Sequence, residues 1–172
     1  MITRTNARLG ALALVAALAL TGCATTPSTD TATEADGVTI TDAWVKSAET
    51  GMSAAFGELA NTGTEDVTVV SATTEASSMI ELHETVENDS GETVMREKDG
   101  GFIIPAGGSF MLEPGGNHIM LMDLTAPLVA GDDVTFTLTF ADDSTLEFTA
   151  PVKDYSGANE TYEGDEEMDM GN

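Results

Sequence analysis

The chain of 172 residues contains a single cysteine, Cys23, and this scarcity limits its chemistry. One cysteine cannot form an internal disulfide, and it cannot build a site of several thiolates. A blue-copper electron-transfer site also needs a Cys thiolate beside two histidines. Because Cys23 lies at the end of an N-terminal apolar run, a metal site in the rest of the chain must use other soft donors.

Basic residues are also scarce, with six Lys and Arg against 30 Asp and Glu and a formal net charge of −24. Binding to nucleic acid relies on basic contacts to phosphates, so this balance excludes nucleic acid as a partner. It equally disfavours docking on anionic lipid head groups. Two interpretations of the acidity stay open: solubility, in a salty habitat for example, or attraction of cations or of a basic partner.

Long hydrophobic runs are absent, and the apolar run from Leu9 to Leu20 is too short to span a bilayer. With Arg4 and Arg8 before it, this run fits the core of a signal peptide. It ends in Leu20-Thr21-Gly22-Cys23, which resembles a bacterial lipoprotein cleavage box. We therefore predict a signal peptide over residues 1–22, a lipid on Cys23, and an extracytoplasmic protein anchored to the membrane by that lipid. The alternative is an ordinary secreted protein with an incidental cysteine.

Two further segments lack the aliphatic residues that a core requires. Residues 23–36 are rich in Thr, Ser and Asp and predict a flexible tether behind the lipid. Residues 154–172 are rich in Gly and acidic residues and predict an acidic, disordered tail. The part between them, residues 37–153, has the size of one ordinary domain.

No long helical stripe occurs in this domain, whereas apolar and polar residues alternate in short runs. The clearest runs are 38–41, 67–70, 134–140 and 145–152, with the Gly-, Asn- and Asp-rich turn signals of a β protein between them. About eight short strands at this spacing predict an all-β fold, either a β-sandwich or a Greek-key barrel.

The only two histidines of the chain stand in a spaced pattern with two methionines, H-x11-M-x22-H-x-M, formed by His83, Met95, His118 and Met120. Imidazole and thioether are soft donors and together favour Cu(I), whereas carboxylate and carbonyl groups suit Mg, Ca or Mn. His118 and Met120 are two residues apart on a predicted strand and so share one face of it. His83 is expected at the end of a strand, with a loop from Glu84 onward and Met95 after that loop.

Four other methionines, Met52, Met79, Met111 and Met122, are expected to be packing residues, as a lone methionine on a strand usually is. No catalytic triad, phosphate-binding loop or distinct acid–base carboxylate pair is apparent. The sequence therefore predicts a metal carrier and not an enzyme. A carrier needs an exposed site, so that the ligands of a partner can enter and the ion can leave.

Several stretches of the domain carry further information: Ile40–Trp44, Ile80–Glu84, Val94–Arg96, Ile104–Leu124, Pro127-Leu128, Gly131-Asp132 and Leu138–Phe140. Together they resemble the periplasmic copper chaperone PCu(A)C family, including its bacterial lipoprotein members. The resemblance implies a cupredoxin-like Greek-key β-sandwich or barrel and one Cu(I) per domain, held by His83, Met95, His118 and Met120. It also implies delivery of copper to the binuclear copper centre of cytochrome c oxidase, with an oxidase subunit or another copper-assembly protein as partner. Within the resemblance we expect Trp44 to be a core aromatic residue and Arg96 to hold the Met95 loop through a carboxylate.

Two other functions stay open at this point. The first is a redox-active copper protein, which redox cycling of the bound metal would reveal. The second is a lipoprotein adhesin or assembly module on the same kind of β-sandwich, which copper titration would separate from a carrier because it would bind no metal.

Overall fold

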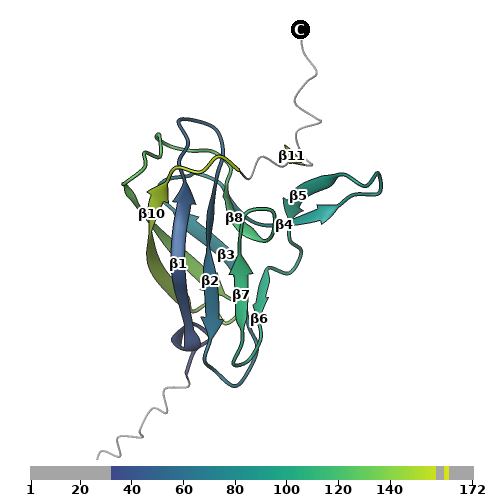
Figure 1. Ribbon diagram of the computed structural model, residues 1–172. Helices are drawn as coiled ribbons and strands as arrows, with labels where there is room; N and C mark the ends of the chain where they lie inside the picture. Colours follow the sequence, from purple (N-terminus) through teal and green to yellow (C-terminus); the bar gives the residue numbers. More distant parts are fainter. Residues whose placement is uncertain (1–31, 158–160, 163–172) are drawn as a thin grey trace, which may run out of the picture. The chain divides into compact units, whose positions relative to one another are not determined.

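The computed structural model describes residues 32–157, together with the backbone of residues 161–162. Within these residues, no helix has the length and apolar character needed to cross a membrane. The predicted signal peptide, Cys23 and most of the tether lie outside them. A short 3-10 helix η1 (Ala35–Gly37) precedes a series of strands, shown in Figure 1. The strands are β1 (Val38–Lys46), β2 (Ser53–Asn61), β3 (Val67–Thr74), β4 (Ile80–Glu87), β5 (Thr93–Glu97), β6 (Phe102–Ile104), β7 (Ser109–Leu112), β8 (His118–Leu121), β9 (Asp133–Phe140), β10 (Thr145–Lys153) and β11 (Thr161–Tyr162).

The strands form two layers that join along one edge. The first layer has the order β5-β4-β8-β2-β1, with β7 also paired to β2 and β11 paired to β5. The second has the order β10-β9-β3-β6. They meet where β1 and β10 run parallel, at the pairs Val45 with Val152 and Lys46 with Lys153. Strands distant in sequence thus lie side by side, as in Greek-key connections, and the predicted all-β fold is confirmed.

The main hydrophobic core lies between the two layers and follows from the alternation in the sequence. Along β9, Val134, Phe136, Leu138 and Phe140 are all buried, while threonines occupy the positions between them. Phe136 stacks on Phe148 of β10 with ring centroids 5.2 Å apart. Each such side chain contributes about 1.5–3 kcal/mol by leaving water.

A second, smaller cluster lies on the other face of the first layer. Side chains alternate along a strand, so Ala55 of β2 and Ile119 of β8 enter the main core, while their neighbours Ala54 and Met120 face outward. We call this second cluster the outer cluster; its members are Ala54, Phe56, Met95 and Met120, with Trp44 and Met122 packed against them. Trp44, expected to be a core aromatic residue, is half-buried and packs against this outer cluster and not in the main core.

Two segments differ from the sequence-based expectation. The loop predicted from Glu84 is strand, since β4 continues to Glu87 and pairs with β5 from Thr93 to Glu97. Figure 1 shows this hairpin extending beyond the two layers. The segment from Glu84 to Glu87 needs little apolar sequence to form a strand, because backbone pairing with β5 holds it in place.

The beginning of the predicted disordered tail, residues 154–157, lies against the domain. The Lys46 ammonium donates a hydrogen bond to the Gly157 carbonyl at 2.5 Å, and the Tyr155 ring meets the edge of Trp44 with centroids 5.3 Å apart. Further on, the backbone of β11 pairs in parallel with Val94 and Met95 of β5. These contacts place the start of the tail beside the outer cluster.

Candidate metal centre

His83 of β4 and His118 of β8 are direct cross-strand partners in the first layer. Their rings lie with centroids 5.4 Å apart at an interplanar angle of 70°. A ring nitrogen binds a metal ion at about 2 Å, so two imidazoles at this separation can share one ion. Both side chains are buried, and His83 has no exposed surface.

The two methionines of the spaced pattern lie on the same outward face as the histidines. Met120 follows His118 by two residues and lies between Ala54 of β2 and Glu81 of β4. Met95 of β5 is the cross-strand partner of Thr85, which follows His83 by two residues on β4. Both methionines are buried members of the outer cluster. The structure therefore places all four donors expected from the sequence on one face of adjacent strands.

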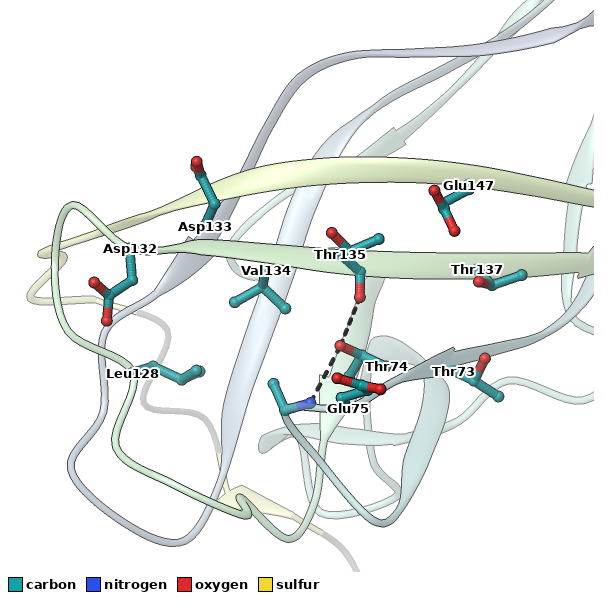
Figure 2. Close-up of a pocket in the computed structure, with 11 residues that line it drawn as sticks. Thr73, Thr74, Glu75, Leu128, Asp132, Asp133, Val134, Thr135, Thr137 and Glu147 are labelled. Atoms are coloured by element: carbon teal, nitrogen blue, oxygen red, sulfur yellow. Dashed lines mark hydrogen bonds between the residues drawn. The ribbon is translucent and has the colours of Figure 1, made fainter.

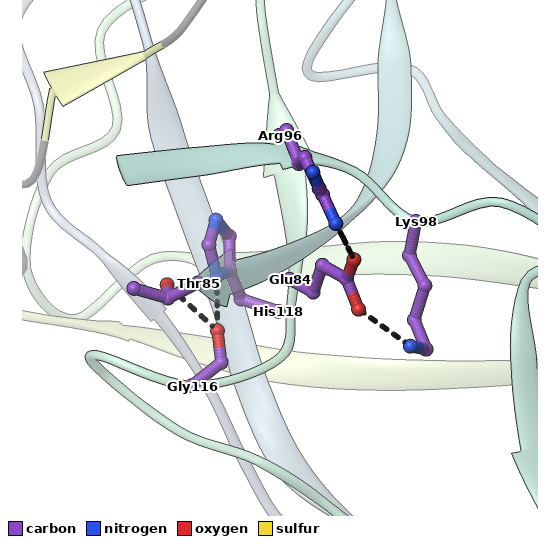
Figure 3. Close-up of polar contacts among 6 residues, drawn as sticks. All are labelled: Glu84, Thr85, Arg96, Lys98, Gly116 and His118. Atoms are coloured by element: carbon purple, nitrogen blue, oxygen red, sulfur yellow. Dashed lines mark hydrogen bonds and ion pairs between the residues drawn. The ribbon is translucent and has the colours of Figure 1, made fainter. Parts of the chain in front are cut away.

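The ring of His118 is oriented by the turn that precedes β8. Its Nδ1 lies 3.1 Å from the Gly116 carbonyl, which also accepts a hydrogen bond from the Thr85 hydroxyl at 3.0 Å (Figure 3). A carbonyl oxygen only accepts, so Nδ1 carries the proton and the lone pair of the neutral ring is on Nε2. Metal-binding histidines are typically oriented in this way.

The ring of His83 is oriented by a carboxylate on its own strand. Its Nε2 lies 2.7 Å from Oε2 of Glu81, a side chain two residues away on the same strand face. An ionised carboxylate accepts this N–H, and the lone pair of neutral His83 is then on Nδ1. Sequence reasoning missed Glu81 as an orienting residue, although its spacing of two residues from a strand histidine is the signal that could have found it.

Glu84, on the reverse face of the hairpin, fastens β4 to β5. It pairs with Arg96 at 3.2 Å and with Lys98 at 2.6 Å (Figure 3). The Lys98 hydrogen bond lowers the pKa of the Glu84 carboxyl below its ordinary value; burial opposes this shift, and the weaker hydrogen bond from Arg96 adds to it. The expected contact of Arg96 with a carboxylate is confirmed. These ion pairs support the strand that carries Met95.

The burial of the four donors differs from the exposed site expected of a carrier. Part of the reason lies in the outer cluster, where the Phe56 ring lies beside His118 with ring centroids 6.2 Å apart. Trp44 is the cross-strand partner of Phe56, with ring centroids 4.6 Å apart. Two aromatic rings therefore flank the histidine pair on the side of β2 and β1.

The donor set favours a soft ion. Residues 32–157 contain no group of three or more His, Cys, Asp and Glu side chains arranged to hold a metal. The buried groups beside the two imidazoles are instead the thioethers of Met95 and Met120, which select Cu(I) over harder cations.

A hollow on the second layer has a different character. It measures about 720 Å³ and is lined by threonines, carboxylates and a few apolar residues (Figure 2). The hydroxyl of Thr74 crosses it to the Thr135 carbonyl at 2.7 Å. The lining includes no His, Met or Cys, so this hollow is separate from the four donors.

Comparison with known proteins identifies close relatives. The family model "Putative lipoprotein LpqE-like" matches residues 38–152. "Putative lipoprotein Lxx21020" of Leifsonia xyli subsp. xyli is 50% identical over 167 residues, which cover 95% of this chain and 100% of the relative.

Solved structures share the fold. The apo PCuAC domain from PmoF1 aligns with a TM-score of 0.59 at 17% identity, covering 69% of this chain and 95% of that domain. The solution structure of apo-DR1885 from Deinococcus radiodurans aligns with a TM-score of 0.54 at 28% identity, covering 88% of this chain and 97% of that one. Its CuI form aligns with a TM-score of 0.52 at 28% identity over 69% of this chain and 80% of that one. The cupredoxin-like fold and the resemblance to PCu(A)C proteins are confirmed.

Proposed function

Since the chain belongs to the family "Putative lipoprotein LpqE-like", we propose that it is a lipid-anchored, extracytoplasmic carrier of Cu(I). Residues 1–22 are then the signal peptide, and Cys23 carries the lipid. Residues 23–36 form the tether, 37–153 the copper-binding domain and 154–172 the acidic tail. The lipoprotein name of the Leifsonia relative supports the anchor.

The observation that carries this proposal is the gathering of His83, Met95, His118 and Met120 on one buried face, with both imidazole rings already oriented. Two neutral imidazoles and two thioethers hold a single Cu(I) without adding charge to it. Pre-oriented rings lower the entropy cost of binding. The CuI form of DR1885, a protein of similar fold, supports copper as the cargo.

Each residue has a distinct role in this carrier. His118 binds through Nε2 while its Nδ1 is held by Gly116, and His83 binds through Nδ1 while Glu81 holds its Nε2. Met95 and Met120 complete the set from β5 and β8. Phe56 and Trp44 keep water from the ion, which protects Cu(I) from oxidation and disproportionation.

The recipient that we propose is the binuclear copper centre of cytochrome c oxidase, or another protein that assembles it. The resemblance to PCu(A)C chaperones supports this choice. The loaded protein should transfer copper to a purified oxidase copper domain in its apo form, followed by the absorption of the assembled centre. No transfer to that domain would remove the oxidase from the proposal and leave the carrier function intact.

Competition with a Cu(I) chelator under anaerobic conditions tests the carrier function itself. We expect one tightly held equivalent per domain, with nitrogen and sulfur neighbours in X-ray absorption, and much weaker binding of Zn(II) because thioethers suit it poorly. Failure to hold any Cu(I) at neutral pH would overturn the proposal. Redox cycling of the bound copper, with turnover of an added donor, would favour a redox protein instead.

A further inference from the structure

Three further methionines lie in one row across the outward face of the first layer. Met79, just before β4, and Met122, just after β8, are joined by a hydrogen bond from the Met122 amide to the Met79 carbonyl at 2.9 Å. Met52, just before β2, lies on the other side of Met122, because the adjacent residues Ser53 and Leu121 are paired. The row therefore runs Met52, Met122, Met79 over three neighbouring strands.

Alternation along the strands aims these three side chains away from the main core. Ile80 and Leu121, which adjoin Met79 and Met122 in sequence, pack into that core, and Met122 packs against the outer cluster. Ala54, two residues after Met52, belongs to the outer cluster and so indicates the same outward face for Met52. Met52 is 38% exposed and Met79 is 52% exposed. The expectation that Met52, Met79 and Met111 are packing residues was wrong, since all three side chains are exposed. The thioethers of Met52 and Met79 are therefore accessible from solvent.

We propose that Met52, Met79 and Met122 form a second, shallow site for Cu(I), built from three thioethers at the solvent side of the buried site. Thioethers are soft, uncharged donors and select Cu(I) or the similar Ag(I) over harder cations. A methionine side chain has three rotatable bonds, so three of them on adjacent strands can converge on one ion. Binding here does not require the buried donors.

The methionine row lies on the same strand face as the proposed buried donors Met120 and His118 of β8. On β8, Met122, Met120 and His118 follow one another at intervals of two residues on the same face, each step covering about 6.7 Å. An ion on the methionine row is thus about 7 Å from the level of Met120 and about 13 Å from the level of His118. Glu81 occupies the intermediate level on β4, where it is the partner of Met120.

Charge at this end of the two strands favours a cation. Asp123 follows Met122 and accepts a hydrogen bond from the Ser78 hydroxyl at 2.7 Å, so a carboxylate is held one residue away from the row along the chain. The shallow site can therefore capture an ion from solution before the buried site receives it. That transfer step rests on the proposed function, whereas the binding of the ion to the three thioethers does not.

Titration of the full chain with Ag(I), followed by the methionine methyl signals in NMR, tests the site. Single Met-to-Leu variants assign each signal. We expect Met95 and Met120 to respond to the first equivalent, and Met52, Met79 and Met122 to respond together to a second, weaker one. The triple variant Met52→Leu, Met79→Leu and Met122→Leu should lose the second equivalent and keep the first.

The matched control is Met111→Leu, which changes a methionine that is 46% exposed on the same layer, opposite Glu58 of β2. It should keep both equivalents, and it should load with Cu(I) faster than the triple variant. Leucine substitution at such positions preserves shape and apolar character, so all variants should fold alike.

Signals of Met52, Met79 and Met122 that stay unchanged would overturn the inference. The acidic tail holds two more methionines, Met168 and Met170. A second equivalent that affects only these two, or one that persists in the triple variant, would also overturn the inference. Responses of the exposed row without responses of Met95 and Met120 would instead refute the proposed function and leave the shallow site standing.

Discussion

His83 and His118 lie opposite each other in register on β4 and β8, and each ring is held by its own acceptor, Glu81 and the Gly116 carbonyl. The pairing is fixed by the backbone ladder, so the two rings are brought together before any ion arrives. Side-chain substitutions that leave the backbone pairing intact can therefore show separately how the proposed donors affect copper affinity and how they affect the stability of the fold.

Replacing Met120 with leucine should lower Cu(I) affinity by at least about 100-fold, because it removes a donor and keeps the side-chain volume. Met111→Leu should leave that affinity unchanged. Chelator competition measures both, and thermal unfolding checks that the fold is retained. Equal losses in the two variants would show that Met120 is not a ligand.

Replacing Glu81 with alanine should weaken Cu(I) binding by about 10–100-fold, because the His83 ring loses the acceptor that orients it. Glu81→Gln retains an acceptor oxygen of similar reach and should recover part of the loss. The same competition assay compares the three proteins. Affinities for Glu81→Ala that equal the wild type would contradict an orienting role.

Glu84→Gln should reduce the free energy of unfolding by up to about 1 kcal/mol at neutral pH, as expected of partly exposed ion pairs with Arg96 and Lys98. The pKa of Glu84 is lowered in the folded protein, so its stabilising contribution is present above the ordinary carboxyl pKa. That contribution is lost as the pH falls below about 4.5 and through the lowered value. Urea unfolding of both proteins should show a difference at pH 7 that shrinks on acidification, and a constant difference would contradict the ion-pair explanation.

Replacing Cys23 with serine should release the protein from the membrane fraction without altering Cu(I) affinity, since lipid attachment needs the thiol and the copper donors belong to another part of the chain. Cell fractionation and chelator competition measure the two properties. Retention of the serine variant in the membrane would contradict a lipid on Cys23.

Local sequence patterns predicted much of the fold. The alternation of Val134 to Phe140 gave β9, and the spacing of His118 and Met120 placed both on one strand face, as the structure has them. The hairpin after His83 escaped prediction because Glu84 and its neighbours are polar on both faces, and only pairing with β5 makes them a strand.

The row of exposed methionines escaped prediction for a different reason. Spacing along one strand tells which side chains share a face, but it carries no information on the register between strands that are far apart in sequence. Met52 and Met79 come beside Met122 only through pairings made by the folded sheet. The four expected donors could be selected from the sequence because the chain has just two histidines, whereas nine methionines gave no such restriction.

Because His83 is completely buried, the rate at which copper leaves the proposed site matters as well as the affinity of the site for copper. An ion held beside His83 and His118 leaves only when the surrounding side chains, Phe56 among them, move aside, and such local openings take microseconds or longer. Small chelators that collide with the surface cannot reach the ion until the site opens, however strongly they bind copper. A recipient that moves these side chains as it docks speeds the release of the ion, and the copper then goes to the protein that can open the site rather than to the one that binds copper most tightly.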